Sequence, residues 1–232
     1  VEKEQTWLQR LAPGLPLPIP APVAAGAPGA GYPFPWSVIA WLDGEALTPA
    51  TDLDHGRLAR DLAGFLRALQ TLDAAGGPAA GDHNFHRGGD LAVYDGQTRA
   101  AVTALGSRID GPAALSLWEA ALATRWDRGP VWVHGDVAPG NLLTREGRLC
   151  AVIDFGTCGV GDPACDLAFA WTFLDDAARP LFFQEMGLDP ETGFRGQAWA
   201  LWKALIVVAG APSVHTRELD LHLRVLKRLG VM

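Results

Sequence analysis

The sequence predicts an α+β fold in which most of the chain is helical and the strands are few, short and grouped apart from the helices. Apolar residues recur at helical spacing in residues 52–73 and in several segments of the second half. Short apolar runs with β-branched residues occur at 36–42 and 131–133, and residues 142–153 have the pattern of a hairpin. The 232 residues, 49% of them hydrophobic, are enough for one substantial core or for two unequal lobes.

The N-terminal segment is predicted to form one amphipathic helix followed by extended chain. Residues 1–11 carry an apolar stripe with charged residues between its members, namely Trp7, Leu8 and Leu11. Residues 11–35 are rich in Pro, Gly and Ala, and the prolines exclude a helix there. Residues 20–25 are expected to form an edge strand, and residues 36–42 a buried strand that ends at Asp43-Gly44.

Helices dominate the remainder of the chain. Residues 52–73 form the strongest helical pattern, capped by Asp52 or Asp54, and a loop over 74–95 follows. The remaining predicted helices cover residues 96–105, 113–125, 162–174, 195–210 and 217–229. Between them lie a β-like run at 131–133, a loop at 135–141 and the hairpin, whose turn is Glu146-Gly147.

Composition excludes several classes of function. The net charge of −7 and the lack of a Lys/Arg cluster argue against a nucleic-acid partner. An acidic balance fits a cationic small molecule, but it fits ordinary solubility as well. No apolar run reaches the roughly 18 residues of a membrane span. The three cysteines have neither disulfide-framework nor zinc-site spacing, so we expect reduced thiols in a cytoplasmic protein.

Three oxygen-bearing side chains near the hairpin are the candidates for chemistry. Asp136 follows the β-like run and can accept a proton from a substrate hydroxyl. Asn141 and Asp154 flank the hairpin, so both can face one Mg²⁺, which prefers a few hard oxygen ligands. Gly156 allows a sharp backbone turn after Asp154. Each of the three is also a common turn residue, and only their joint spacing favours function.

Their spacing matches a known pattern for phosphoryl transfer, in which a loop Asp is followed five residues later by Asn and then by Asp-Phe-Gly. Residues 134–141 read His-Gly-Asp-x4-Asn, and residues 153–156 read Ile-Asp-Phe-Gly. These motifs, with Gly-Asp-Pro-x2-Asp-Leu-Ala at 161–168, resemble the aminoglycoside phosphotransferase family. Protein kinases have His-Arg-Asp instead and an Ala-Pro-Glu signature, which argues against a protein kinase here.

The resemblance covers essentially the whole chain and implies a protein-kinase-like fold. It implies transfer of the γ-phosphate of ATP or GTP, with Mg²⁺, to a hydroxyl of a small molecule such as an aminoglycoside-like antibiotic or a metabolite. In this interpretation Asp136 is the catalytic base. Asn141 and Asp154 hold Mg²⁺, while His134 and Asp166 support the loop.

The resemblance also implies a division into lobes. Residues 1–41 correspond to a remnant of an N-terminal lobe, and residues 42–232 to a C-terminal catalytic and substrate-binding lobe. The nucleotide base is expected to meet the hinge strand, which contains Ile39, Ala40, Trp41 and Leu42. Glu4 corresponds to the helix carboxylate that pairs with an ATP-binding lysine.

The sequence departs from the family at its start. A Gly-rich phosphate loop and a strand with the lysine should precede Glu4, and the sequence before Glu4 holds only Lys3 on the first helix. We therefore expect an N-terminally truncated chain that transfers phosphate weakly or not at all on its own. Self-association through apolar surface that the missing lobe leaves exposed is a further expectation.

The acceptor and one alternative function stay open. Recognition of the acceptor is assigned to residues 52–128 and the C-terminal helices, and the loop with His83 and His86 could contribute. The acidic candidates for a cationic aminosugar are Asp175, Asp176, Glu185 and Glu218. The alternative is a catalytically silent kinase-like fragment that acts as a binding module.

Overall fold

The computed structural model describes residues 1–211 and 216–232, with the side chain of Arg217 also left out. Its helices are α1 Glu2–Leu11, α2 His55–Thr71, α3 Asp95–Leu105, α4 Gly111–Leu122, α5 Ala164–Leu167, α6 Phe169–Thr172, α7 Ala178–Met186, α8 Pro190–Gly210 and α9 Arg217–Arg228. Its strands are β1 Pro22–Gly26, β2 Trp36–Ile39, β3 Glu45–Ala46, β4 Val131–Val133, β5 Leu142–Arg145, β6 Arg148–Val152 and β7 Gly159–Gly161. Throughout this described part, every helix is too short or too polar to cross a bilayer.

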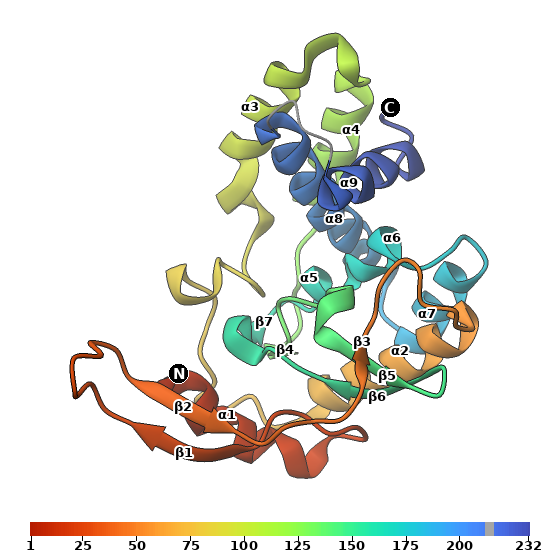
Figure 1. Cartoon of the computed structure of the whole chain (residues 1–232). Helices are drawn as coiled ribbons and strands as arrows, with labels where there is room; N and C mark the ends of the chain where they lie inside the picture. The colour runs from red at the N-terminus through yellow and green to blue at the C-terminus, as the bar shows by residue number, and fades with distance from the viewer. Residues whose placement is uncertain (212–215) are drawn as a thin grey trace.

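The predicted α+β class is confirmed, and the strands form small antiparallel sheets rather than one large one. The β1–β2 hairpin projects from the body, the β3–β5–β6 sheet carries the predicted hairpin, and β4 pairs with β7 (Figure 1). The hairpin turn has positive φ at Glu146 (53°) and Gly147 (71°), the backbone that a tight two-residue turn requires.

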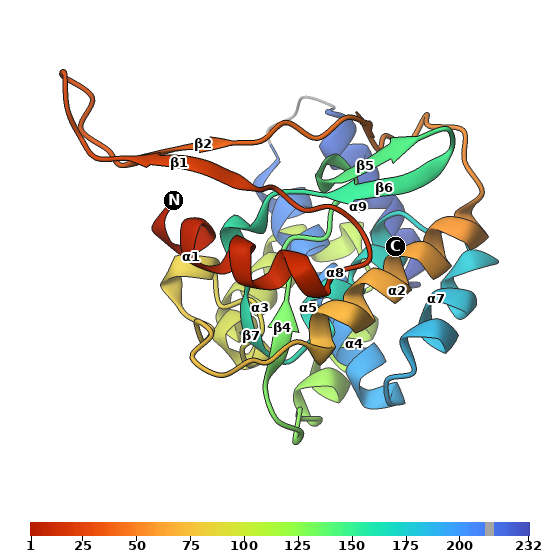
Figure 2. The same cartoon turned by 90° about the horizontal axis from the view of Figure 1, so that it is seen from below.

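One apolar core joins these sheets to the helices. The helix α2 buries its predicted face and packs against α7 and against β4 and β6. The long helix α8 runs through the upper part of the molecule and packs against α3, α4, α5 and α9 (Figure 1). The first helix also joins the core, because Leu8 and Leu11 are buried and Trp7 packs on Trp132 with ring centres 4.8 Å apart. It lies on the face seen in Figure 2, next to α2 and away from α9.

The helical predictions differ from the structure in three places. The predicted helix at 162–174 is broken at Ala168 into two single turns, α5 and α6. The helix predicted from residue 195 begins already at Pro190, since Asp189 accepts the Thr192 N–H and caps it. The helix α7 was missed, because only Phe182 and Met186 give it an apolar repeat beside Ala178.

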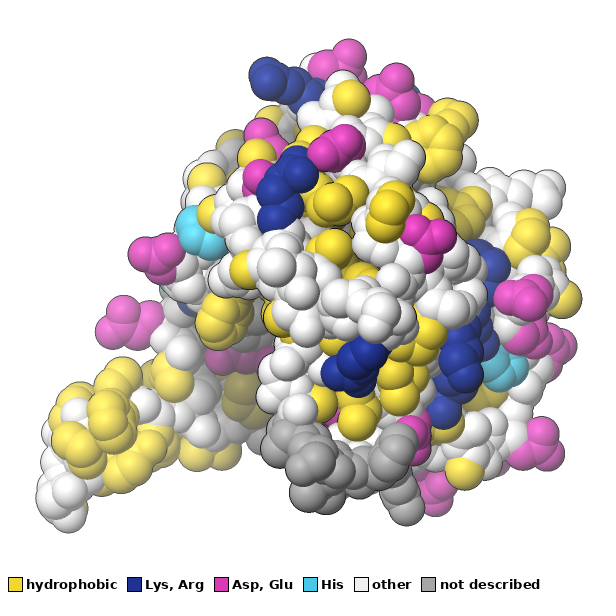
Figure 3. All heavy atoms as spheres, turned by 90° about the horizontal axis from the view of Figure 1, so that it is seen from above, with side chains coloured by type: hydrophobic (Ala, Val, Ile, Leu, Met, Phe, Trp, Pro, Cys, Tyr) yellow, Lys and Arg dark blue, Asp and Glu magenta, His cyan; other side chains and the backbone are white. Residues whose placement is uncertain are grey.

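The prediction of a buried strand at 36–42 is wrong. The strand β2 is shorter and exposed, and the Trp41 side chain beyond it is 87% exposed. Within the described residues β2 pairs with β1 alone, so this ribbon has no second sheet to cover it. The Trp36 ring folds across Gly26 on the ribbon itself, in space that a Cβ at this position would occupy. Hydrophobic side chains therefore gather on the projecting hairpin in Figure 3.

Candidate active site

The sheets bring the two predicted motifs together. The strand β4 delivers residues 134–141, and the β5–β6 hairpin returns the chain to Asp154. At the base of this hairpin the Ile153 N–H donates to the Asn141 carbonyl oxygen at 2.9 Å. Asn141 and Asp154 thus leave neighbouring positions of one small sheet, as the sequence predicted.

Asp136 and Asn141 contact one another directly. The Asn141 Nδ2 donates to the backbone oxygen of Asp136 at 2.9 Å and to its Oδ2 at 3.1 Å. Asp136 is exposed, so its carboxylate is open to a substrate. Because the Asn141 amide nitrogen is directed at Asp136, its Oδ1 remains free to act as a ligand.

Asp154 takes a left-handed backbone conformation, with φ 65° and ψ 67°. Asp tolerates this region better than most residues, and such strain is often found at functional sites. The sharp turn assigned to Gly156 in the sequence lies at Asp154 instead, since Gly156 has no positive φ. Gly156 supports the site by donating its N–H to Asp154 Oδ1, at 3.4 Å. The Asp154 side chain is exposed.

His134 is buried beneath the loop, and its ring connects Asp136 of the loop to Ile153 at the end of the hairpin. Its Nδ1 accepts the Asp136 N–H at 3.2 Å, and its Nε2 lies 3.0 Å from the Ile153 carbonyl oxygen. Since Nδ1 accepts, the proton must be on Nε2, which donates to Ile153. The ring also packs on Phe155, with centres 4.6 Å apart. This arrangement fits a structural role for His134 and leaves it no route to the substrate.

Asp166 is fully buried and supports the same loop. Its Oδ2 accepts the His134 N–H and its Oδ1 the Gly135 N–H, each at 2.8 Å. Burial raises the pKa of this carboxyl, although the two backbone donors act in the opposite direction. Asp166 is thus a buried support of the loop and not an exposed helix charge.

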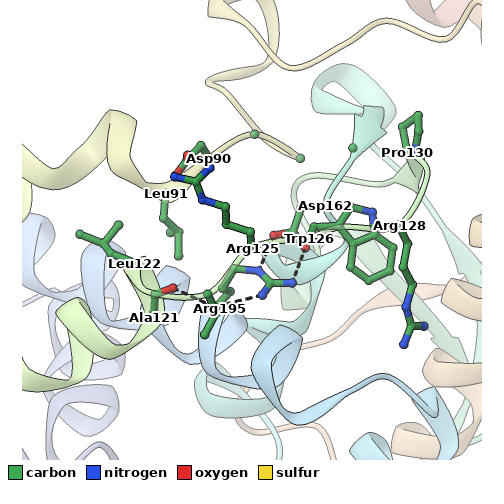
Figure 4. A pocket seen from close by; sticks show the side chains of 14 residues that line it. Asp90, Leu91, Ala121, Leu122, Arg125, Trp126, Arg128, Pro130, Asp162 and Arg195 are labelled. Carbon is green, nitrogen blue, oxygen red and sulfur yellow. Dashed lines mark hydrogen bonds and ion pairs between the residues drawn. The ribbon is translucent and has the colours of Figure 1, made fainter.

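Asp162 both caps a helix and forms a buried ion pair. Its Oδ1 accepts the Ala164 N–H at 3.0 Å, and its Oδ2 lies 2.6 Å from Arg195 Nε. Burial raises the pKa of Asp162 even beside this guanidinium. Figure 4 shows the pair in the wall of a cavity of about 310 Å³, where Arg195 also reaches Thr124. That cavity is not lined by Asp136, Asn141 or Asp154, so we assign it no part in the chemistry.

Gly135 is required by the geometry of the loop. It has φ 83°, and a Cβ there would lie 2.6 Å from the Thr157 carbonyl oxygen. We expect Gly135→Ala to lower the free energy of unfolding by about 2–4 kcal/mol, through the left-handed backbone and this clash. Gly140→Ala in the same loop is the control, because φ is not positive there and a Cβ would meet open space. Urea unfolding of both variants checks this, and equal midpoints would contradict it.

The candidate nucleotide residues occupy the opposite end of the chain. Ile39 ends β2, and Ala40, Trp41 and Leu42 follow it, with the Ala40 N–H donating to the Ala21 carbonyl. Glu4 lies on α1, which contacts the Phe155–Thr157 turn directly after Asp154. The neighbouring Lys3 Nζ donates to the Cys158 carbonyl at 3.0 Å. The structure thus places Glu4 on the Asp154 side, whereas the role of 39–42 stays a prediction.

Two cavities open beside Asp136, of about 340 Å³ and about 510 Å³. Four residues line both of them: Arg87, Asp136, Trp202 and Lys203. Of the acidic acceptor candidates only Glu218 lines either cavity. The others lie around α7, where Asp175 caps the helix and Asp176 pairs with Arg179.

The sequence did not single out the cavity residues of α8. Trp199, Trp202 and Lys203 fall within the helix predicted at 195–210, and tryptophans in such a helix would ordinarily be read as core residues. Both tryptophans are indeed nearly buried, yet they also line the cavity beside Asp136. A helical pattern shows which residues share a face, but not that this face meets the catalytic loop. His83, His86 and the loop at 87–90 were expected as possible substrate contacts; His86 and Arg87 line the cavity of about 510 Å³, and His83 does not.

The donor set fits a magnesium ion better than a transition metal. Among the described residues no group of three or more His, Cys, Asp or Glu side chains is arranged to hold a metal. Asn141 and Asp154 offer one neutral and one charged oxygen ligand, and Mg²⁺ takes its other ligands from water and phosphate.

Comparison with known proteins identifies the family. The sequence model of the phosphotransferase enzyme family (APH) matches residues 1–205. A shorter stretch of 47 residues is 43% identical to an aminoglycoside 3'-phosphotransferase of Escherichia coli. That match covers 20% of this chain and 17% of the Escherichia coli protein.

Solved structures confirm the kinase-like fold. A mutant of aminoglycoside 2'-phosphotransferase IIIa bound to GDP superposes with a TM-score of 0.67 at 20% identity, over 98% of this chain and 78% of that one. A mutant of APH(4)-Ia with AMP-PNP and hygromycin B gives 0.64 at 18% identity, over 98% and 80%. The macrolide 2'-phosphotransferase MphH of Brachybacterium faecium gives 0.58 at 24% identity, over 96% and 78%. At identities of 18–24%, these superpositions support the fold alone and not a shared substrate.

Proposed function

The chain belongs to the phosphotransferase enzyme family, and from that premise we propose that it transfers the γ-phosphate of ATP or GTP to a hydroxyl of a small molecule. The contact between Asn141 and Asp136, next to Asp154 across the base of the hairpin, carries this proposal. The loop that carries Asp136 is held from below by the buried His134 and Asp166. The carboxylates of Asp136 and Asp154 are exposed, and Asp136 lines two cavities.

We assign Asp136 the role of the general base. Its carboxylate orients the acceptor hydroxyl and takes the proton as the oxygen bonds to the γ-phosphorus, while the bond from phosphorus to the leaving diphosphate breaks. The Asn141 amide holds the Asp136 carboxylate by its Oδ2, which leaves Oδ1 of Asp136 to meet the hydroxyl. His134 and Asp166 keep the Asp136 backbone in place from below.

We assign Asn141 and Asp154 the role of ligands of the divalent cation. When bound, Mg²⁺ supplies positive charge over the phosphate oxygens, where charge develops during transfer. The Gly156 N–H donates to Asp154 Oδ1, which orients the carboxylate before any ligand arrives. The proposed nucleotide side consists of residues 1–41 and the adjoining Leu42; it would meet the base through 39–42 and the phosphates near Glu4.

Transfer is tested with γ-labelled ATP and GTP, the 232-residue chain in excess over nucleotide, and a panel of hydroxylated acceptors. We expect slow labelling of the acceptor, because the sequence predicts weak transfer by this chain alone, and only when Mg²⁺ and the acceptor are both present. A matched reaction with EDTA is the control. Release of labelled inorganic phosphate alone, at the same rate with or without acceptor, would contradict the proposal. Binding of metal and nucleotide with no transfer to any acceptor would favour the silent binding module instead.

The exposed apolar hairpin supports a proposal of self-association. Its exposed large side chains include Val23, Tyr32, Phe34, Trp36, Val38 and Ile39. A patch of this kind is typical of a surface that is covered in use. We expect sedimentation velocity to show concentration-dependent dimers or larger species that Val38→Lys reduces. Val93→Lys is the control, since Val93 is similarly exposed but lies far along the chain, just before α3. A monomer at every concentration would contradict this.

A further inference from the structure

The two cavities beside Asp136 share two positively charged residues. Arg87 and Lys203 line both cavities together with Asp136. Neither cation has a carboxylate oxygen within 4.0 Å among the residues that the structure describes. The whole chain is acidic, with a net charge of −7, so two unpaired cations next to the catalytic carboxylate are a local feature.

Arg87 occupies the aromatic surface of the cavity. Its Cζ lies 4.8 Å from the ring centre of Trp199 and 5.2 Å from that of Trp202. The faces of tryptophan rings attract cations, and an ammonium group of a substrate would be drawn to such a pair. Here the guanidinium of the chain fills that position. Tyr94 stacks on Trp202 with centres 3.9 Å apart, which covers more of the same aromatic surface.

Acidic groups for a polycationic acceptor are few. Apart from Asp136, the acidic side chains that line the two cavities are Asp82 and Glu218. Asp82 already lies 3.1 Å from His86 and is fully exposed. His222 also lines the cavity of about 340 Å³, and burial and the nearby charge of Lys203 lower its pKa to about 4, so this ring is neutral near pH 7. The acidic side chains that share a cavity with Lys203 are therefore Asp136, Glu218 and the exposed Asp82.

We propose that the phosphate acceptor carries an anionic group, a carboxylate or a phosphate, which Lys203 and Arg87 bind beside Asp136. This inference rests on the proposed function and names its class of substrate. The Arg87 guanidinium packs on Trp199 and Trp202, and its Cβ lies against Gly135 of the catalytic loop. The catalytic loop supplies an apolar wall through Val137, Ala138 and Pro139, which suits the uncharged body of such an acceptor.

Equilibrium binding to three matched probes tests the charge preference without nucleotide. The probes are para-hydroxymethylbenzoate, the neutral benzene dimethanol and para-hydroxymethylbenzylamine, with kanamycin as a polycationic aminosugar. Titration calorimetry should show the benzoate binding at least about tenfold more tightly than the benzylamine. Lys203→Gln should remove most of that difference and Lys203→Glu should reverse it. Lys227→Gln, which removes an exposed lysine of α9 outside both cavities, should leave it unchanged.

Two results would overturn the inference. One is tighter binding of the benzylamine or kanamycin than of the benzoate to the unaltered chain. The other is a Lys203→Gln variant that binds the benzoate as before but transfers phosphate more slowly to every acceptor, because Lys203 would then act on the nucleotide phosphates.

Transfer to the same compounds separates this inference from the proposed function. Lys203-dependent binding of the benzoate without labelling of any acceptor would leave the inference standing and contradict the phosphotransferase assignment. Labelling of kanamycin, with no binding of the benzoate, would do the reverse.

Discussion

Asp136→Asn is expected to slow phosphoryl transfer roughly a hundredfold to ten-thousandfold, the usual contribution of a positioned general base. The amide has nearly the shape of the carboxylate, and its oxygen can still accept the hydrogen bond from Asn141. It cannot take the proton of the acceptor hydroxyl. Single-turnover transfer from γ-labelled nucleotide measures the effect.

Folding must be unchanged for this result to have meaning. Asp136 is exposed, so we expect the urea midpoint of Asp136→Asn to match that of the unaltered chain. Asp127→Asn removes the same charge from an exposed position in the segment after α4 and should transfer normally. Transfer by Asp136→Asn at more than about a tenth of the unaltered rate would contradict the role given to this carboxylate.

Asp154→Asn is expected to weaken Mn²⁺-dependent nucleotide binding about a hundredfold or more, since it removes the charged member of the proposed ligand pair. Asn is the appropriate replacement because it tolerates a φ of 65° as well as Asp does. The backbone should therefore keep its conformation while the ligand charge is lost. Electron paramagnetic resonance of Mn²⁺, titrated with nucleotide present, measures the binding.

The control for this second variant is Asp52→Asn, an exposed carboxylate ahead of α2. It should bind Mn²⁺ and nucleotide as the unaltered chain does. The Asp154 assignment is wrong if both variants bind alike. It is also wrong if Asp154→Asn loses stability, because the weaker binding would then reflect a distorted hairpin.

Local patterns predicted the loop and the hairpin that carry the candidate residues, because both are formed by residues close in sequence. Asp136, Asn141 and Asp154 lie within 19 residues, and the hairpin brings Asn141 beside Ile153, the residue before Asp154. The α2 helix was likewise predictable, since its apolar face and its Asp54 cap depend only on residues close together in the sequence. Gly135 belongs to the same loop motif, but the close approach of Thr157 that requires a glycine there is visible only in the folded chain.

What failed depended on contacts between distant segments. The strand at 36–42 has a buried composition, but burial needs a partner layer, and in the described residues β2 pairs with β1 alone. The break between α5 and α6 lies where Asp166 turns inward to the catalytic loop, an interaction across about thirty residues. Arg87 and Lys203 lie on two segments far apart in sequence. A hydrophobic period within one segment cannot show that the two segments meet at a cavity.

The central claim is that Asn141 and Asp154 hold one divalent ion next to Asp136. Crystals grown with Mn²⁺ and a non-hydrolysable ATP analogue, measured for the anomalous scattering of manganese, test it directly. We predict one anomalous peak within about 2.2 Å of Asn141 Oδ1 and of an Asp154 carboxylate oxygen, with the γ-phosphate between the ion and Asp136. A bound nucleotide whose manganese lies elsewhere, with Asn141 and Asp154 both without contact to it, would contradict the account.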